Sequence, residues 1–447
     1  MILKRKIDKY LLSWKTKKNR KPLVIRGARQ VGKTFSALTF AKKYFKNTIH
    51  INLENPEHLK SFQEPISLKE FEKIIKVNFK KTIEPGKTLI FIDELQNSPS
   101  LIKLLRFFKE EWPKIHVIAT GSLLEVIIKK QGFSIPVGRV EYLYLYPLDF
   151  FEYLDAKKEK ELLSFLQNIQ LEEKIPLAIH EKAMDIFHEY TMIGGMPEIV
   201  KLFLQGETMK ELKITYSSIF RGYCEDVYKY SSKANSKYLK YSIERLPLFA
   251  GNTITYEKFG EMEKKSREIK KSFDTLQDAM IVYQVKATKS TELPLISQNK
   301  RPKKMIFLDT GLVNYQMGIL EKYLNIKNLN DFYKGRIAEQ IVGQNILSQF
   351  THSPANLFYW AKEKPKGNAE IDFCLNKNGL LIGIEVKSGK TGRLRSLHQF
   401  SQNTKNNQII RIYSGEFKKE KIEIKNKKNE LISIPFYLIP CYLEKII

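Results

Sequence analysis

The chain has 447 residues, a length that suggests about three domains. Its residues are 43% hydrophobic and 12% aromatic, a composition that excludes a disordered protein. Its 76 Lys and Arg against 49 Asp and Glu give a net charge of +27, which favours an anionic partner, nucleic acid before a membrane surface. A protein from a lysine-rich proteome, whose lysines only cover solvent-exposed faces, would have the same excess of positive charge. Three distant cysteines argue against a disulfide framework, and no apolar run is long enough to span a membrane. We therefore expect a cytoplasmic protein.

The first elements predict a nucleotide-binding unit. Residues 1–22 are basic and indicate an amphipathic helix, whose apolar stretch is too short for a signal peptide. The apolar run Leu23–Ile25 predicts a strand, and an amphipathic helix is expected from Phe35 to Tyr44. Between them lies GARQVGKT, which fits the phosphate-loop pattern of glycine, four residues and Gly-Lys-Thr. The context of strand, loop and helix favours a nucleotide site over a glycine turn that matches by chance.

This loop has the chemistry to hold ATP and Mg²⁺. Gly27 and Gly32 let successive backbone N–H groups turn inward around the phosphates, and the following helix points its positive end at them. Lys33 supplies a positive charge to the β- and γ-phosphates, and Thr34 offers a hydroxyl to Mg²⁺. The predicted nucleotide-binding residues are Gly27, Ala28, Arg29, Gln30, Val31, Gly32, Lys33 and Thr34.

Two acidic residues follow the next buried strand. We expect a strand at Thr48–Leu53, a helix at Leu68–Thr82 and a strand at Thr88–Ile92, whose continuous apolarity fits a parallel sheet covered on both faces. Asp93 and Glu94 come directly after it, at the carboxyl end, where ligands bind in open α/β sheets. Asp93 is predicted to hold Mg²⁺, and Glu94 to orient and deprotonate the attacking water. An acidic turn without function is the alternative.

Further candidates for the nucleotide site lie beyond a helix at Ser100–Lys109 and a strand at Ile115–Ala119. Thr120 and Ser122 follow that strand and can hydrogen-bond the γ-phosphate or the attacking water, although Ser122 would serve equally as a helix N-cap. Arg139 follows a loop and can act as an arginine finger, in cis or from a neighbouring subunit. A simple ion pair is the alternative for Arg139.

Shifts in pattern divide the chain into four parts. We expect an ATPase core over residues 1–150, a helical lid over 151–248, a winged-helix module over 249–320 and a nuclease-like domain over 321–447. The lid is broken at Gly194–Pro197, and its charged residues Arg221 and Asp226 are expected to form salt bridges.

The third part has the outline of a winged helix. Helices are expected at Thr255–Met262 and Ser266–Met280, and strands at Ile281–Ala287 and Lys304–Leu308. In such a module the second helix enters the major groove of DNA. Basic residues gather on that helix and on the wing, namely Lys264, Lys265, Arg267, Lys270, Lys271, Lys300, Arg301, Lys303 and Lys304. They predict contacts with DNA phosphates, a module used only for packing being the alternative.

The last part holds a second group of chemically active residues. Glu339 lies in an expected helix, and Asp372 in a strand that precedes a turn and the strand Ile382–Lys387. Glu385 and Lys387 are two residues apart on that strand and so face the same side, with Asp372 opposite them across a hairpin. Glu339, Asp372 and Glu385 are predicted to bind Mg²⁺, and Lys387 to steer or activate water. A salt bridge on a half-exposed hairpin is the alternative.

In this order the motifs resemble those of bacterial and archaeal ATPases with an N-terminal AAA+-type domain and a C-terminal DUF4143 domain similar to PD-(D/E)XK nucleases. The resemblance covers nearly the whole chain and rests on GARQVGKT, FIDELQ, ATGSLLE, PVGRVEYLYLYPLDFFEYL, GGMPEIV, KKMIFLDTGL, AEIDF and IEVKSG. The first two are general to phosphate-loop NTPases, and the others, in this order, are specific. The resemblance implies an α/β fold with an AAA+-like parallel sheet and a restriction-endonuclease-like C-terminal domain. It also implies ATP binding and hydrolysis. By position it assigns phosphate and Mg²⁺ roles to Lys33 and Thr34, and metal and water roles to Asp93 and Glu94. For the nuclease-like motif it matches Glu339, Asp372, Glu385 and Lys387.

We therefore expect an ATPase that engages DNA through a winged helix and carries a Mg²⁺-dependent nuclease-like domain. The alternative is a nucleotide-switched DNA-binding or regulatory protein whose nuclease fold is a non-cleaving scaffold. A peripheral membrane ATPase would need a longer basic amphipathic anchor than the N-terminal helix. DNA is favoured over RNA, and a homo-oligomer is compatible with the sequence.

Overall fold

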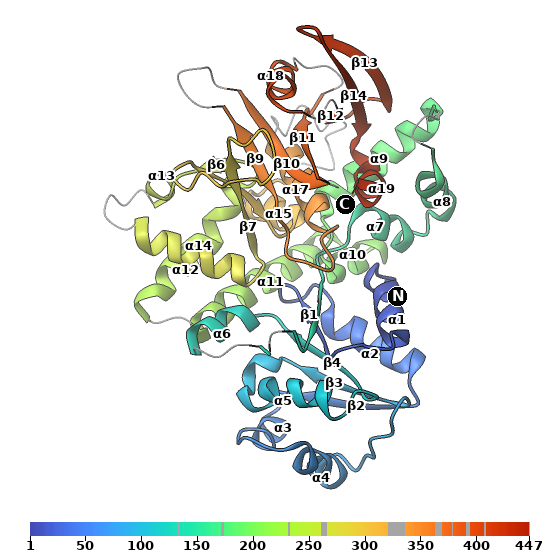
Figure 1. Ribbon diagram of the computed structural model, residues 1–447, viewed down its shortest axis with the longest axis vertical. Helices are drawn as coiled ribbons and strands as arrows, with labels where there is room; N and C mark the ends of the chain where they lie inside the picture. The colour runs from blue at the N-terminus through green and yellow to red at the C-terminus, as the bar shows by residue number, and fades with distance from the viewer. Residues whose placement is uncertain are drawn as a thin grey trace.

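The computed structural model describes residues 1–131, 135–136, 138–170, 174–230, 233–260, 266–320, 336–362, 369–377, 379–389, 394–405 and 408–446. Figure 1 shows a smaller sheet formed by the N-terminal part, at the bottom, and a larger sheet formed by the C-terminal part, at the top, with α10 and α11 between them. None of the helices in these ranges combines the length and apolarity needed to cross a lipid bilayer.

The N-terminal sheet is parallel, with five strands in the order β2-β3-β4-β1-β5. Its strands are β1 (Leu23–Arg26), β2 (Asn47–Asn52), β3 (Thr88–Asp93), β4 (His116–Gly121) and β5 (Glu141–Tyr144). The helices around it are α1 (Ile7–Thr16), α2 (Lys33–Tyr44), α3 (Pro56–Lys60), α4 (Leu68–Asn78), α5 (Pro99–Glu110) and α6 (Leu124–Gln131). Because β3 and β4 are covered on both faces, every residue in them is buried, as their apolar sequences predict.

A helical part follows, as expected from the sequence. It consists of α7 (Phe150–Ala156), α8 (Lys160–Asn168), α9 (Leu177–Ile193), α10 (Pro197–Leu204), α11 (Met209–Tyr230) and α12 (Lys233–Arg245). The break between α9 and α10 is tightly packed: Gly194 has a φ of 74°, and a Cβ there would lie 2.1 Å from Oδ1 of Asp309. Glycine is therefore required at this position by both backbone conformation and space.

The larger sheet has nine strands in the order β13-β14-β12-β11-β10-β9-β7-β8-β6. Its strands are β6 (Thr253–Ile254), β7 (Val282–Thr288), β8 (Lys303–Phe307), β9 (Phe358–Ala361), β10 (Glu370–Lys377), β11 (Leu380–Val386), β12 (Gln408–Tyr413), β13 (Lys418–Ile424) and β14 (Lys427–Pro435). The accompanying helices are α13 (Tyr256–Gly260), α14 (Ser266–Asp278), α15 (Thr310–Gln316), α17 (Arg336–Leu347), α18 (Arg395–Asn403) and α19 (Ile439–Ile446).

One sheet thus joins two segments that the sequence suggests are separate domains. β8 pairs antiparallel with β6 and β7, which gives the helix, helix and hairpin outline expected for residues 249–320. β7 also pairs in parallel with β9, with Lys286 beside Phe358, and so extends the sheet into the C-terminal part. Side chains of β8 therefore lie close to the predicted nuclease-like residues.

Candidate functional site

The phosphate loop connects β1 to α2, as its sequence predicts. Gly32 caps α2 with a φ of 96°, and Gln30 also has a positive φ, of 63°. At Gly27, a Cβ would lie 2.3 Å from the carbonyl oxygen of Leu145, so a larger residue cannot fit there. These constraints explain why residues 27 and 32 are glycines.

Lys33 is held in the loop by the loop's own backbone. Its Nζ donates to the carbonyl oxygen of Gly27 at 3.0 Å and to that of Ala28 at 2.7 Å. The side chain is buried, which lowers the pKa of Lys33, while the carboxylates of Glu94 and Asp93 act in the opposite direction. The ammonium group lines a cleft of about 500 Å³, where it can meet an anionic ligand.

Asp93 ends β3 beside the loop, where the sequence predicts it. Thr34 Oγ1 donates to Asp93 Oδ2 at 2.9 Å, the hydroxyl of Thr120 donates to Oδ1, and His50 Nε2 lies 3.8 Å from Oδ2. Burial raises the pKa of Asp93, but the contacts with His50, Thr120 and Thr34 outweigh burial and bring this pKa below its ordinary value. The Thr34 hydroxyl and an ionised Asp93 are oxygen donors of the kind that Mg²⁺ accepts together with phosphates and water. The residues present therefore fit the ion.

Glu94 and Ser122 also meet at this edge of the sheet. Glu94 has a φ of 54°, a left-handed conformation that turns its side chain away from the line of β3. Its Oε2 accepts a hydrogen bond from Ser122 Oγ at 3.2 Å and a second from the side-chain amide of Gln96. These two contacts fix the carboxylate at the rim of the cleft that Lys33 lines.

Arg139 does not join this group, so its predicted contact with the γ-phosphate in cis is wrong. Its Nε pairs with Glu110 Oε1 at 2.7 Å, the ion pair that the alternative interpretation predicts. The reason is topological: Arg139 precedes β5, which is parallel to β1, and therefore lies at the amino edge of the sheet, whereas the phosphate loop follows the carboxyl end of β1. Only a contact from a neighbouring subunit stays open to Arg139.

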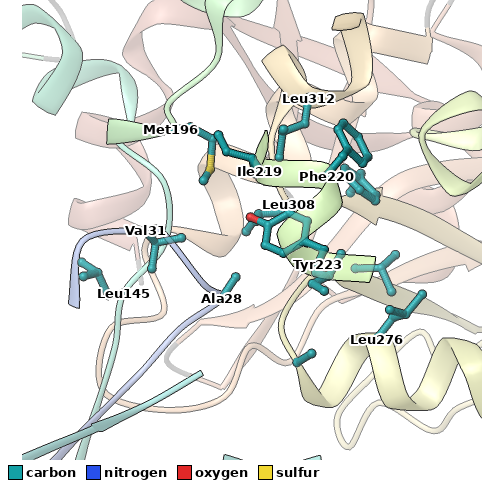
Figure 2. Packing of buried hydrophobic residues seen from close by; sticks show 14 of the residues in the cluster. Ala28, Val31, Leu145, Met196, Ile219, Phe220, Tyr223, Leu276, Leu308 and Leu312 are labelled. Carbon is teal, nitrogen blue, oxygen red and sulfur yellow. The ribbon is translucent and has the colours of Figure 1, made fainter. Parts of the chain in front are cut away.

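The helical part reaches the phosphate loop through α11. Arg29 forms an ion pair with Asp226, which confirms the salt bridge predicted for Asp226. The hydroxyl of Tyr223 donates a hydrogen bond to the carbonyl oxygen of Arg29 at 3.2 Å. Figure 2 shows Ala28 and Val31 in one apolar cluster with Tyr223. The loop is thus packed against the lid as well as against its own sheet.

The predicted nuclease-like residues are also brought together. β10 and β11 are antiparallel, with Phe373 beside Ile384, which places Asp372 opposite Glu385 as expected. Asp372 Oδ2 accepts from the backbone N–H of Val386 at 2.8 Å, and Glu385 Oε1 lies 2.5 Å from Lys387 Nζ. Burial and the nearby Asp372 carboxylate raise the pKa of Glu385 to about 7.

Three family models match separate parts of the chain. A model for an AAA domain matches residues 19–154, and models for two domains of unknown function, DUF8612 and DUF4143, match residues 184–323 and 334–437. The chain combines an AAA-type P-loop ATPase domain with a DUF4143 domain. This confirms the family resemblance inferred from the motifs.

Several solved structures are similar to this chain. A Walker-type ATPase of Pyrococcus abyssi is 16% identical, over 71% of this chain and 96% of that one, with a TM-score of 0.44. The ORC2 protein of Aeropyrum pernix, in ADPNP–ADP complexes, is 12% identical over 71% and 92%, with a TM-score of 0.27. The RuvB Holliday junction branch migration motor of Thermotoga maritima is 16% identical over 63% and 90%, with a TM-score of 0.29. No curated protein matches the chain.

The position of Lys304 corrects one prediction about the winged-helix module and one about the DUF4143 domain. It is not an exposed DNA contact on the wing, because its side chain is 2% exposed and lies among acidic residues. Its Nζ is 2.7 Å from Glu339 Oε2 and 3.0 Å from Asp372 Oδ1. The predicted Mg²⁺ ligands Glu339, Asp372 and Glu385 are thus each paired with a lysine, the last with Lys387. Within the described residues no group of three or more His, Cys, Asp or Glu is arranged to hold a metal ion.

Two residues around the AAA domain's cleft, Arg5 and Lys201, are missed by the sequence analysis. Arg5, from the N-terminal segment, donates to the carbonyl oxygens of Val31 at 2.9 Å and Tyr146 at 2.7 Å, and so fixes the phosphate loop from outside. Lys201 lines the cleft from α10. The GGMP break signals a sharp turn before α10, but not that the helix faces the loop. Arg5 stands in a run of basic residues, so no pattern distinguishes it.

Proposed function

We propose that this protein binds and hydrolyses ATP in the AAA domain, engages DNA through the module that contains α14, and acts in the cytoplasm as a nucleotide-dependent switch. The observation that supports the proposal is that Lys33 and Thr34, at the start of α2, line one cleft of about 500 Å³ together with Asp93 and Glu94. Thr34 also donates a hydrogen bond to Asp93 there. Charges of both signs converge there in the arrangement that phosphoryl transfer requires.

Each residue at the cleft has a distinct part in the proposed reaction. Lys33 binds the terminal phosphates once its ammonium exchanges the Gly27 and Ala28 carbonyl oxygens for phosphate oxygens. Thr34 and Asp93 would hold Mg²⁺, which when bound neutralises charge on the phosphates. Glu94 orients the attacking water and accepts its proton, with its carboxylate held in place by Ser122.

Replacing Glu94 with glutamine tests the hydrolytic role. We expect Glu94→Gln to lower the ATP turnover rate by roughly 10²–10⁴-fold, because the amide cannot accept the proton, with ATP affinity nearly unchanged. Phosphate release measures turnover, and a fluorescent ATP analogue measures affinity. Glu72→Gln, an exposed change on α4, is the matched control. Turnover by Glu94→Gln at the wild-type rate would remove Glu94 from the mechanism.

The DNA proposal rests on the basic surface of α14. Arg267, Lys270 and Lys271 are exposed, while Ile269 and Phe273 bury the opposite face of the helix. The predicted contacts Lys264 and Lys265 lie outside the described residues, and Lys304 is buried. Burial and the nearby charges of Lys286 and Lys270 lower the pKa of Lys303, although Asp274 acts in the opposite direction. Like charges held this close favour an anionic partner.

Removing three charges from α14 tests this surface. The triple variant Arg267→Ala, Lys270→Ala, Lys271→Ala is expected to bind duplex DNA more weakly and to reduce the slope of log affinity against log salt by roughly 2 to 3, because each phosphate contact contributes about 0.9. Fluorescence anisotropy across a salt series measures both. The control removes the same charge from α4, with Lys69→Ala, Lys73→Ala and Lys76→Ala, all exposed. Equal losses in the two triple variants would show that net charge, not α14, drives binding.

Nucleotide binding can reach α14 through contiguous packing. Ala28 and Val31 of the phosphate loop share one buried cluster with Tyr223 of α11, Leu276 of α14 and Leu308 after β8 (Figure 2). Closely packed interiors transmit small displacements rather than absorb them. We therefore propose that the nucleotide state changes how α14 is presented to DNA.

For the DUF4143 domain we propose the non-cleaving alternative. Phosphodiester cleavage with Mg²⁺ would need carboxylate oxygens of Asp372 and Glu385 open to the ion. In the structure three of these four oxygens are engaged: Asp372 Oδ1 is paired with Lys304, Asp372 Oδ2 accepts the backbone N–H of Val386, and Glu385 Oε1 is paired with Lys387. Glu385 Oε2 is buried and has no hydrogen-bond partner among the described residues. This arrangement favours a scaffold over a nuclease.

A further inference from the structure

Lys304 is enclosed by carboxylates. Besides the contacts with Glu339 and Asp372, its Nζ lies 3.7 Å from Glu370 Oε1 and 3.3 Å from the carbonyl oxygen of Asp372. The aromatic rings of Phe373 and Tyr359 lie 5.3 and 5.8 Å from the same nitrogen. The three N–H donors of the ammonium thus have oxygen acceptors, and the rest of its surroundings excludes water.

The charge balance of this cluster explains why a lysine is buried there. Carboxylates that approach one another away from water need a positive charge among them, because their mutual repulsion and lost hydration are otherwise uncompensated. A divalent metal would supply that charge in a nuclease site. Here the Lys304 ammonium already supplies it, on the side of Asp372 where a metal shared with Glu339 would have to lie.

The lysine belongs to a different segment from the acidic residues. Lys304 lies on β8, within the DUF8612 match, whereas Glu339, Glu370 and Asp372 come from α17 and β10 of the DUF4143 domain. β8 reaches them because β7 and β9 pair and join the two segments in one sheet. The neighbouring module therefore closes the acidic cluster.

We propose that Lys304 is an internal counter-cation that takes the place of a divalent metal, so that the DUF4143 domain binds no Mg²⁺ while β8 stays in this position. The proposal deepens the non-cleaving role given to this domain and is independent of ATP hydrolysis, since its test contains no nucleotide. It also accounts for the intact acidic motif without cleavage: the carboxylates serve to bind β8.

Replacement of Lys304 by methionine should therefore create a metal site. In nucleotide-free protein, Mn²⁺ binding followed by electron paramagnetic resonance is expected to show at least one more ion per chain in Lys304→Met than in wild type. The double variant Lys304→Met/Asp372→Asn should lose this additional ion, because it lacks a carboxylate that the site requires. Lys421→Met, an exposed change on β13, removes the same charge elsewhere and should gain no ion.

Two further outcomes are decisive even if Lys304→Met is poorly folded. Repulsion among the unpaired carboxylates is expected to lower its melting temperature in EDTA, and Mn²⁺ should restore part of that loss while leaving the wild-type melting temperature unchanged. The comparison of wild type with Asp372→Asn needs no lysine variant: both should bind equal amounts of Mn²⁺. A wild-type ion that Asp372→Asn abolishes would overturn the proposal, as would a folded Lys304→Met that gains neither an ion nor stability from Mn²⁺.

Discussion

Lys33→Ala is expected to weaken Mg²⁺·ATP binding by at least about 100-fold and to abolish measurable turnover. The ammonium group exchanges two carbonyl contacts, at 3.0 and 2.7 Å, for contacts with phosphate oxygens. Charge-assisted hydrogen bonds contribute roughly 1.5–3 kcal/mol each, so the loss of two corresponds to about 10²–10⁴ in affinity. Isothermal titration with ATP measures the change.

The matched control for Lys33→Ala is Lys42→Ala, on the exposed side of the same helix. It removes the same charge from α2 and should bind ATP as the wild type does. Unfolding curves of both variants separate loss of the site from loss of the fold. ATP affinity retained by a folded Lys33→Ala would contradict the assignment of the phosphate site.

Asp309→Ala is expected to destabilise the protein by roughly 3–5 kcal/mol, because it leaves several buried donors without an acceptor. The fully buried carboxylate accepts from the backbone N–H of Gly195 at 2.6 Å and of Leu312 at 3.2 Å, and from the side-chain amide of Gln344 at 3.1 Å. It therefore ties the GGMP break, α15 and α17 together. Chemical denaturation measures the loss, and Asp185→Ala, an exposed change on α9, should be nearly neutral.

The pH dependence of stability gives a second test of Asp309. Burial raises the pKa of Asp309 to about 6, although its hydrogen bonds act in the opposite direction. Since this native pKa exceeds the unfolded value, the folded state binds more protons, and the contribution of this group to stability falls as the pH rises from about 4 through about 6. Asp309→Asn, which does not titrate, should flatten this part of the profile. An unchanged profile would show that Asp309 is not held in this environment.

The sequence predicts the ATPase domain well because its signals are local. The apolar runs Leu23–Ile25 and Thr88–Ile92 form strands of the parallel sheet. The phosphate loop follows the first run in the sequence, and Asp93 and Glu94 follow the second. Residues that follow parallel strands meet at one edge, so Lys33 and Asp93 can be placed together without a structure. The predicted cis contact of Arg139 is wrong because Arg139 precedes β5. Only residues that follow parallel strands meet at the carboxyl edge of the sheet.

Contacts between segments that are distant in the sequence cannot be predicted from such local patterns. Lys304 directly precedes the apolar run Met305–Leu308 on a hairpin strand, and nothing local distinguishes it from Lys303. Its burial follows from the pairing of β7 with β9, which joins segments that differ in pattern and look like separate domains. Arg5, which supports the phosphate loop from the N-terminal segment, is missed for the same reason.

The most direct test compares ATP binding and turnover in wild type, Lys33→Ala and Glu94→Gln side by side, with Mg²⁺ and with and without duplex DNA. We expect wild type to bind and hydrolyse ATP at a rate that DNA changes, Lys33→Ala to lose both activities, and Glu94→Gln to keep binding while losing turnover. Wild-type protein that binds no ATP, or a Glu94→Gln variant that hydrolyses it at the wild-type rate, would contradict the proposed function.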